Sequence, residues 1–93
     1  MYEKLGCFIN GEWRTETGKG ENVINPVDES VLAFLPHATK KDLEDALESA
    51  KNGFTIWKNT PVQERAEILQ KTANLIEERS EQISRIITLE QGK

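Results

Sequence analysis

Residues 39–93 read TKKDLEDALESAKNGFTIWKNTPVQERAEILQKTANLIEERSEQISRIITLEQGK, and they carry three amphipathic patterns separated by two helix-stop signals. Apolar residues recur at intervals of three and four, which places them on one side of an α-helix. The patterns predict helices over about 39–57, 61–79 and 81–91. We expect the segments before residue 39 to lie against these helices.

The first two predicted helices differ in how their apolar residues are distributed. The first has one apolar side, formed by Leu43, Ala46, Leu47, Ala50, Phe54 and Trp57. We expect the opposite face to contact solvent, because charged residues cover it. These are Lys40, Lys41, Glu44, Asp45, Glu48 and Lys51. The second has a face of Ala66, Leu69, Ala73 and Ile76, widened by Val62, Ile68 and Leu75. This wider apolar surface predicts more than one packed neighbour.

Capping residues mark where the helices begin. Thr39 with Asp42 is typical of a capping box, in which each side chain bonds the backbone of the other residue. Thr60 before Pro61 predicts the second cap, since proline suits the first helical position. Ser80 is the cap expected for the third helix.

The three helices present more apolar surface than the short segments before them can cover. Large exposed apolar patches indicate a missing partner surface. The sequence also closes on Gly92-Lys93, directly after the last helical pattern. We therefore expect these residues to be part of a longer protein.

The region before the helices predicts short antiparallel strands between about residues 5 and 36. Asn10-Gly11 is a strong signal for a two-residue hairpin turn, because both residues tolerate a positive φ. A further strand is expected over Glu21–Asn25. Val31–Pro36 is either buried on both faces or paired with Val23–Asn25. The predicted fold class is α+β in one unit of residues 1–93, with a strand region at 1–38 and a helical region at 39–93.

Composition narrows the classes of partner. The chain has 93 residues, a net charge of −4 and 30% charged residues of mixed sign. This balance gives no reason to expect nucleic acid or an anionic membrane as a partner. No apolar run approaches the roughly 18 residues of a membrane span. The single cysteine, Cys7, cannot form an internal disulfide, and we expect a reducing, cytoplasmic setting.

No self-contained catalytic group of residues is evident. His37 is the only histidine and has no Cys, Asp or second His at metal-ligand spacing, which favours a surface or turn position. Cys7 lies in the first strand region and is expected to be a small buried or edge residue.

Taken in order, the motifs resemble the N-terminal segment of the NAD(P)-dependent aldehyde dehydrogenases. The matching pieces are Phe8-Ile9-Asn10-Gly11-Glu12-Trp13, Ile24-Asn25-Pro26, Val31-Leu32-Ala33, Arg65-Ala66 with Ile68-Leu69, and Thr88-Leu89-Glu90-Gln91-Gly92-Lys93. The last piece most resembles the succinate-semialdehyde dehydrogenase branch. The resemblance spans essentially the whole chain and implies part of the coenzyme-binding domain of that fold.

The resemblance implies an enzyme that oxidises an aldehyde, expected to be succinate semialdehyde, to its carboxylate. In that family a cysteine thiolate attacks the carbonyl, hydride passes to NAD or NADP, and a glutamate activates water. None of those residues is expected within this chain, so it should be inactive alone. Its partners would be the remainder of the subunit and further subunits of a homo-oligomer.

The resemblance also implies one binding site. Several members hold a structural Na⁺ or K⁺ near positions that correspond to Val23, Ile24 and Glu90. Backbone oxygens of Val23 and Ile24 suit a hard cation. A cation would also offset the unfavourable position of the Glu90 carboxylate in the last turn of its helix. Valine lacks the threonine hydroxyl that some members offer at position 23.

A different class of function stays open. Apolar helix stripes can bind a helix of another protein, so the chain could be a free-standing α+β interaction module. Continuation of the gene past Lys93 into a coenzyme site would discriminate the two hypotheses.

Overall fold

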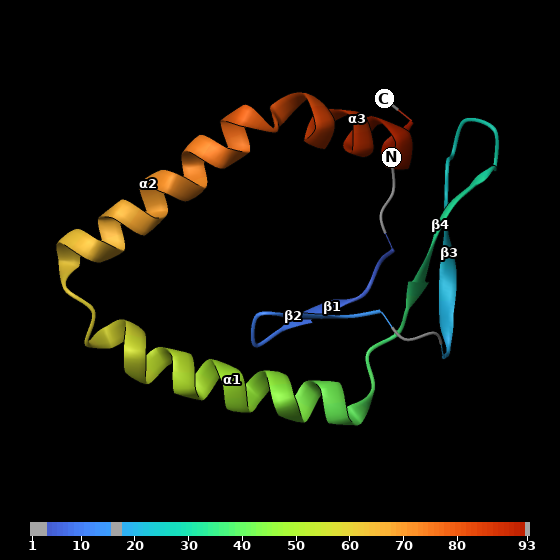
Figure 1. The fold of residues 1–93 in the computed structure, drawn as a ribbon. Coiled ribbons are helices and arrows are strands. Elements are labelled where there is room, and N and C mark those ends of the chain that lie inside the picture. Colours follow the sequence, from blue (N-terminus) through green and yellow to red (C-terminus); the bar gives the residue numbers. More distant parts are fainter. Residues whose placement is uncertain (1–3, 16–17, 93) are drawn as a thin grey trace.

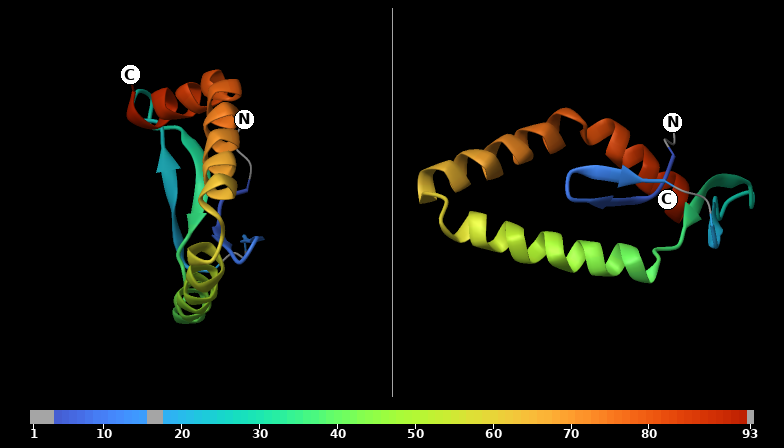
Figure 2. Two further views of the ribbon diagram at one scale, coloured as in Figure 1. Left: turned by 90° about the vertical axis from the view of Figure 1, so that its left-hand side faces the viewer. Right: turned by 60° about the horizontal axis from the view of Figure 1, so that its bottom comes forward.

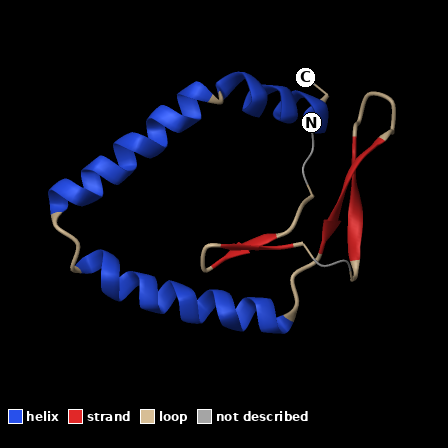
Figure 3. Cartoon of the chain, in the orientation of Figure 1, coloured by secondary structure: helices blue, strands red, loops and turns tan. Residues whose placement is uncertain are grey.

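The computed structural model describes residues 4–15 and 18–92. The elements follow the order β1 (Cys7–Ile9), β2 (Glu12–Arg14), β3 (Gly20–Ile24), β4 (Val31–Pro36), α1 (Lys40–Lys58), α2 (Val62–Glu78) and α3 (Ser80–Gln91). Two antiparallel strand pairs precede three helices (Figure 3), which confirms the predicted α+β class. Each helix boundary lies within one or two residues of its predicted position.

The turn between β1 and β2 has the backbone that the Asn-Gly pair predicts. Asn10 has a φ of 51° and Gly11 a φ of 77°. This left-handed backbone matches the twist of the flanking strands, and it sets Phe8 opposite Trp13. The rings of Phe8 and Trp13 meet edge to face with centroids 5.0 Å apart. The hairpin prediction is confirmed.

The second hairpin pairs β3 with β4. Val23 lies opposite Ala33, and Ile24 lies opposite Val31 after a bulge. This register confirms pairing as the role of Val31–Pro36. The alternative, burial on both faces, is wrong because Val31 and other residues of β4 are exposed.

Helix α1 begins with the predicted capping box. The Thr39 hydroxyl accepts from the Asp42 amide at 3.1 Å. The Asp42 carboxylate accepts from the Thr39 amide at 2.8 Å. Thr39 therefore holds the first turn through two reciprocal bonds.

The caps predicted for the other two helices are wrong. Pro61 occupies the N-cap position of α2, and Arg79 that of α3, both without a side-chain capping bond. The Thr60 hydroxyl donates to the Ile56 carbonyl at 2.8 Å and so completes the end of α1 instead. Ser80 is already the first residue of α3. At the other end of α3, Gly92 has a φ of 72° and is the expected C-cap.

The elements surround an open ring rather than a filled core (Figures 1 and 2). Helices α1 and α2 diverge from their connection, α3 returns toward β3 and β4, and the β1–β2 hairpin lies inside the ring. The radius of gyration is 16.8 Å, whereas a compact chain of this length has about 12 Å. Among the described apolar residues, only Ile9 is buried.

The accessible surface measures how incomplete this packing is. The chain exposes 7913 Å², whereas a compact monomer of this mass exposes about 5,500 Å². Much of the exposed surface belongs to the helix stripes, and no described helical residue is fully buried. The predicted excess of apolar surface is confirmed.

Candidate functional site

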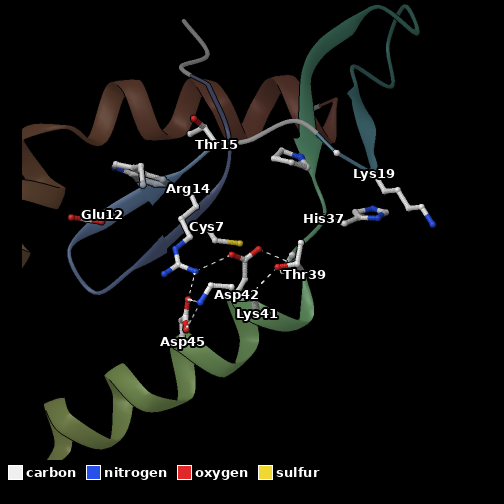
Figure 4. Close-up of a pocket in the computed structure, with 14 residues that line it drawn as sticks. Cys7, Glu12, Arg14, Thr15, Lys19, His37, Thr39, Lys41, Asp42 and Asp45 are labelled. Carbon is white, nitrogen blue, oxygen red and sulfur yellow. Dashed lines mark hydrogen bonds and ion pairs between the residues drawn. The ribbon is translucent and has the colours of Figure 1, made fainter.

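A hydrogen-bonded junction between distant segments joins the end of β2 to the first turns of α1. Arg14 Nη1 donates to Asp45 Oδ2 at 2.8 Å and to Asp42 Oδ1 at 3.0 Å. Figure 4 shows the guanidinium reaching down from the hairpin between the two carboxylates. We call Arg14, Asp42 and Asp45 the arginine junction.

Local structure explains how these three residues meet. Asp42 and Asp45 are one turn apart and share one side of α1. The capping box fixes Asp42, and Lys41 contributes a further ion pair to Asp45, with Nζ and Oδ2 3.3 Å apart. Register places Arg14 opposite Cys7 in the hairpin. The position of Asp45 corrects the sequence prediction, which assigned it to a solvated face.

The charges at the junction stabilise one another. The pKa of Asp42 is lowered, first because its carboxylate accepts from the Thr39 amide and then because it accepts from Arg14. Hydrogen bonding to Arg14 is also the main cause of the lowered pKa of Asp45. The same bonds raise the pKa of Arg14. All three groups are therefore charged at neutral pH.

A pocket of about 1130 Å³ opens beside the arginine junction. Its lining includes Cys7, Trp13, Lys19, Pro36, His37, Thr39 and the junction residues. His37 Nε2 lies 3.8 Å from Glu21 Oε1, with both side chains largely exposed. This exposed contact agrees with the predicted surface role of His37. Four charged residues of the pocket lining, Arg14, Lys41, Asp42 and Asp45, are joined to one another in ion pairs.

The three residues predicted for a monovalent cation lie in two segments that the fold brings together. Val23 and Ile24 end β3, and Glu90 lies near the end of α3. A Cβ atom added at Gly92 would lie 3.1 Å from Pro26 Cγ and 3.4 Å from Val27 Cγ2. The end of α3 therefore packs against the turn after β3. Cation binding by these residues stays a prediction.

Other metal sites can be assessed from side-chain clusters. Within residues 4–15 and 18–92, no group of three or more His, Cys, Asp or Glu side chains could hold a metal ion. None of the helices described is long and apolar enough to cross a membrane.

The β1–β2 hairpin packs on the polar edge of α1 and leaves the apolar stripe exposed. Arg14 binds Asp42 and Asp45, and the Ser49 hydroxyl lies 3.5 Å from Asn10 Oδ1. At about 100° per residue, the stripe of α1 centres roughly 120° away from this edge. Its large members are exposed by 58% for Leu43, 63% for Leu47 and 65% for Phe54. The stripe is thus available to another surface.

The described residues form two strand pairs and three helices whose apolar faces are largely exposed. Residues 13–93 match the aldehyde dehydrogenase family. The chain belongs to the aldehyde dehydrogenase family.

Among its relatives are malonate-semialdehyde dehydrogenases from several bacteria. The protein from Lacticaseibacillus casei is 46% identical over 92 residues, covering 96% of this chain but 18% of the relative. Malonate-semialdehyde dehydrogenase 2 of Geobacillus kaustophilus is 41% identical, covering 98% of this chain and 19% of the relative. The enzyme from Bacillus cytotoxicus is 43% identical with the same coverage. The chain therefore spans less than a fifth of the length of these relatives.

Proposed function

We propose that the chain is the N-terminal structural part of an NAD(P)-dependent aldehyde dehydrogenase, with residues 1–38 and 39–93 as its strand and helical regions. The observation that carries this proposal is the family match over residues 13–93, in a chain that covers 18% to 19% of the relatives' length. The remaining four-fifths of such a subunit would bind NAD or NADP and supply the catalytic cysteine and glutamate. This segment alone is inactive.

Its role in the enzyme is architectural. The arginine junction fixes the β1–β2 hairpin to α1, and the helices present their apolar stripes outward. The rest of the subunit covers these stripes, and the complete subunits form a homo-oligomer in the cytoplasm. Na⁺ or K⁺ bound near Val23, Ile24 and Glu90 would hold α3 against the end of β3. Neither nucleic acid nor a membrane is a partner in this proposal.

The relatives favour one substrate over the one expected from the sequence. Their names specify malonate semialdehyde, whereas the ending Thr88–Lys93 suggested succinate semialdehyde. Both molecules carry a carboxylate beside the aldehyde, and succinate semialdehyde is longer by one methylene. We propose malonate semialdehyde as the substrate of the complete enzyme, with succinate semialdehyde as the alternative.

The test is an assay of the longest in-frame product of the gene with each semialdehyde. Because one methylene in a pocket changes kcat/KM by about tenfold or more, the two substrates should be clearly separated. A higher kcat/KM for malonate semialdehyde supports the proposal. A higher kcat/KM for succinate semialdehyde would favour that molecule as the substrate. A gene that ends at Lys93 would favour the free-standing interaction module.

A further inference from the structure

Helix α2 has an arginine in the middle of its apolar surface. At about 100° per residue, the apolar residues of α2 cover an arc of roughly 180°. Ile68 and Leu75 lie at one edge of this arc, Ala66 and Ala73 lie at the other, and Arg65 is near the centre. A helix that buries a single stripe needs an arc of only about 100°. We call this surface the α2 arc.

The α2 arc is open to solvent except at Arg65. The exposed fractions are 49% for Ile68, 63% for Leu69, 44% for Leu75 and 56% for Ile76. Arg65 is the one residue of α2 that is not exposed. Its Nε atom is withdrawn from solvent and has no hydrogen-bond partner among the described residues. The arc therefore contains both apolar surface to be covered and a donor that lacks an acceptor.

The size of the relatives indicates what covers the arc. They are about five times as long as this chain, so a large body of polypeptide belongs to the same subunit. The accessible surface of the chain exceeds that of a compact monomer by roughly 2,400 Å², which is the scale of a permanent interface. Such an interface would remove the remaining water around the Arg65 guanidinium. A buried guanidinium is costly unless a carboxylate or other acceptor meets it.

We propose that the remainder of the same subunit covers the α2 arc and places a carboxylate where it accepts from the outward-facing nitrogens of the Arg65 guanidinium, beside the enclosed Nε. The inference rests on the proposed function, since it names the partner that the structural segment docks to. It assigns Arg65 a positioning role at the interface between this segment and the rest of the enzyme. The polar side of α2, which includes Lys71, stays in solvent.

The experiment uses a fusion in which this chain replaces the matching residues of the Lacticaseibacillus casei relative. Arg65→Met removes the guanidinium but keeps an unbranched apolar side chain. Arg65→Lys keeps the positive charge but loses Nε. Lys71→Met removes a charge that lies outside the arc on the same helix and is the matched control. Melting temperature is measured for each variant in the fusion and in the 93-residue chain alone, together with the activity of the fusions.

The expected result is a loss of about 3 °C or more for Arg65→Met in the fusion, because the partner carboxylate is left buried without its cation. Arg65→Lys loses less than Arg65→Met but more than Lys71→Met, since the lysine amine keeps the cation but not the planar set of guanidinium donors. The melting temperature of the Lys71→Met fusion stays within about 1 °C of the unsubstituted fusion. In the isolated chain, the melting temperatures of all variants stay within about 1 °C of the unsubstituted chain. If the Arg65→Met fusion does not accumulate in soluble form, the Arg65→Lys fusion is compared with the Lys71→Met fusion instead.

Equal shifts for Arg65→Met and Lys71→Met in the fusion would overturn the inference. So would an isolated chain that dimerises with an affinity dependent on Arg65, because a second copy would then occupy the arc. An unsubstituted fusion that melts cooperatively but is inactive would count against the proposed function itself. An active fusion that is insensitive to Arg65 would contradict only the docking inference.

Discussion

Arg14 and Asp45 are 31 positions apart in the sequence, yet their side chains are joined by a hydrogen bond of 2.8 Å. This bond, with its neighbour to Asp42, attaches the β1–β2 hairpin to α1. The arginine junction places the hairpin on the polar edge of the helix. The apolar stripe of α1 is thereby left for another surface.

Loss of the arginine should release the hairpin from the helix. Arg14→Gln removes the guanidinium, whose Nη1 binds both carboxylates, and leaves a shorter, neutral polar side chain. We expect amide hydrogen exchange in Cys7–Ile9 to become faster by about tenfold or more. A rate change of this size corresponds to the free energy of roughly one charge-assisted hydrogen bond. Lys41→Gln is the control, because Lys41 pairs with Asp45 within α1. Unchanged exchange in the Arg14 variant would show that the junction does not hold the hairpin.

Acid should weaken the same attachment. The pKa values of Asp42 and Asp45 lie below the ordinary value of 3.8, so each carboxylate stabilises the folded state fully above that pH. The contribution is lost as the pH falls below about 4 and through the lowered pKa values. Arg14, whose pKa is raised, stays charged throughout. Carboxyl NMR titration should give Asp45 a pKa below 3.8 in the unsubstituted chain. In Arg14→Gln, the pKa of Asp45 should move back toward 3.8. An Asp45 that titrates at 3.8 or above in the unsubstituted chain would refute the ion pair.

Two threonines near helix starts should behave differently. Thr39→Ala removes the hydroxyl that caps α1 and should destabilise its first turn by about 1 kcal/mol. Thr60→Ala should leave the start of α2 unaffected, because that hydroxyl bonds the end of α1. Amide exchange in the first turns of the two helices measures both effects. Faster exchange at the start of α2 in Thr60→Ala would support the sequence prediction over the structure.

Alanine substitutions at two glycines should change the stability of the chain in opposite directions. Gly11→Ala forces a side chain into a φ of 77° and should destabilise the hairpin by about 1 kcal/mol. Gly53→Ala lies inside α1 with open space around the added Cβ, and should stabilise the helix by up to about 1 kcal/mol. Urea unfolding followed by circular dichroism would measure the two changes. A stabilising Gly11→Ala would contradict the turn geometry.

Features set by neighbouring residues were predictable from the sequence. The Asn10-Gly11 turn, the Thr39 capping box and the Gly92 C-cap each depend on a few adjacent positions. Thr60 was assigned to the wrong helix because a hydroxyl between two helices can bond either one. Its local sequence does not determine which carbonyl or amide it meets.

The functional residues that the sequence did not reveal depend on distant contacts. Asp45 looked like part of a solvated face, and only the fold brings Arg14 to it. The spacing of Asp42 and Asp45 by one helical turn was the available signal, but it does not identify the cation. Arg65 stood in the family-like motif without an assigned role, and its withdrawn Nε emerges only in three dimensions.

The most direct test of the central claim is aldehyde-dependent formation of NADH or NADPH by the 93-residue chain, beside the fusion with the remainder of the Lacticaseibacillus casei relative. The account predicts no turnover above background for the chain alone and clear turnover for the fusion. Turnover by the chain alone would contradict the structural role proposed for it. A folded but inactive fusion would contradict its place in an aldehyde dehydrogenase subunit.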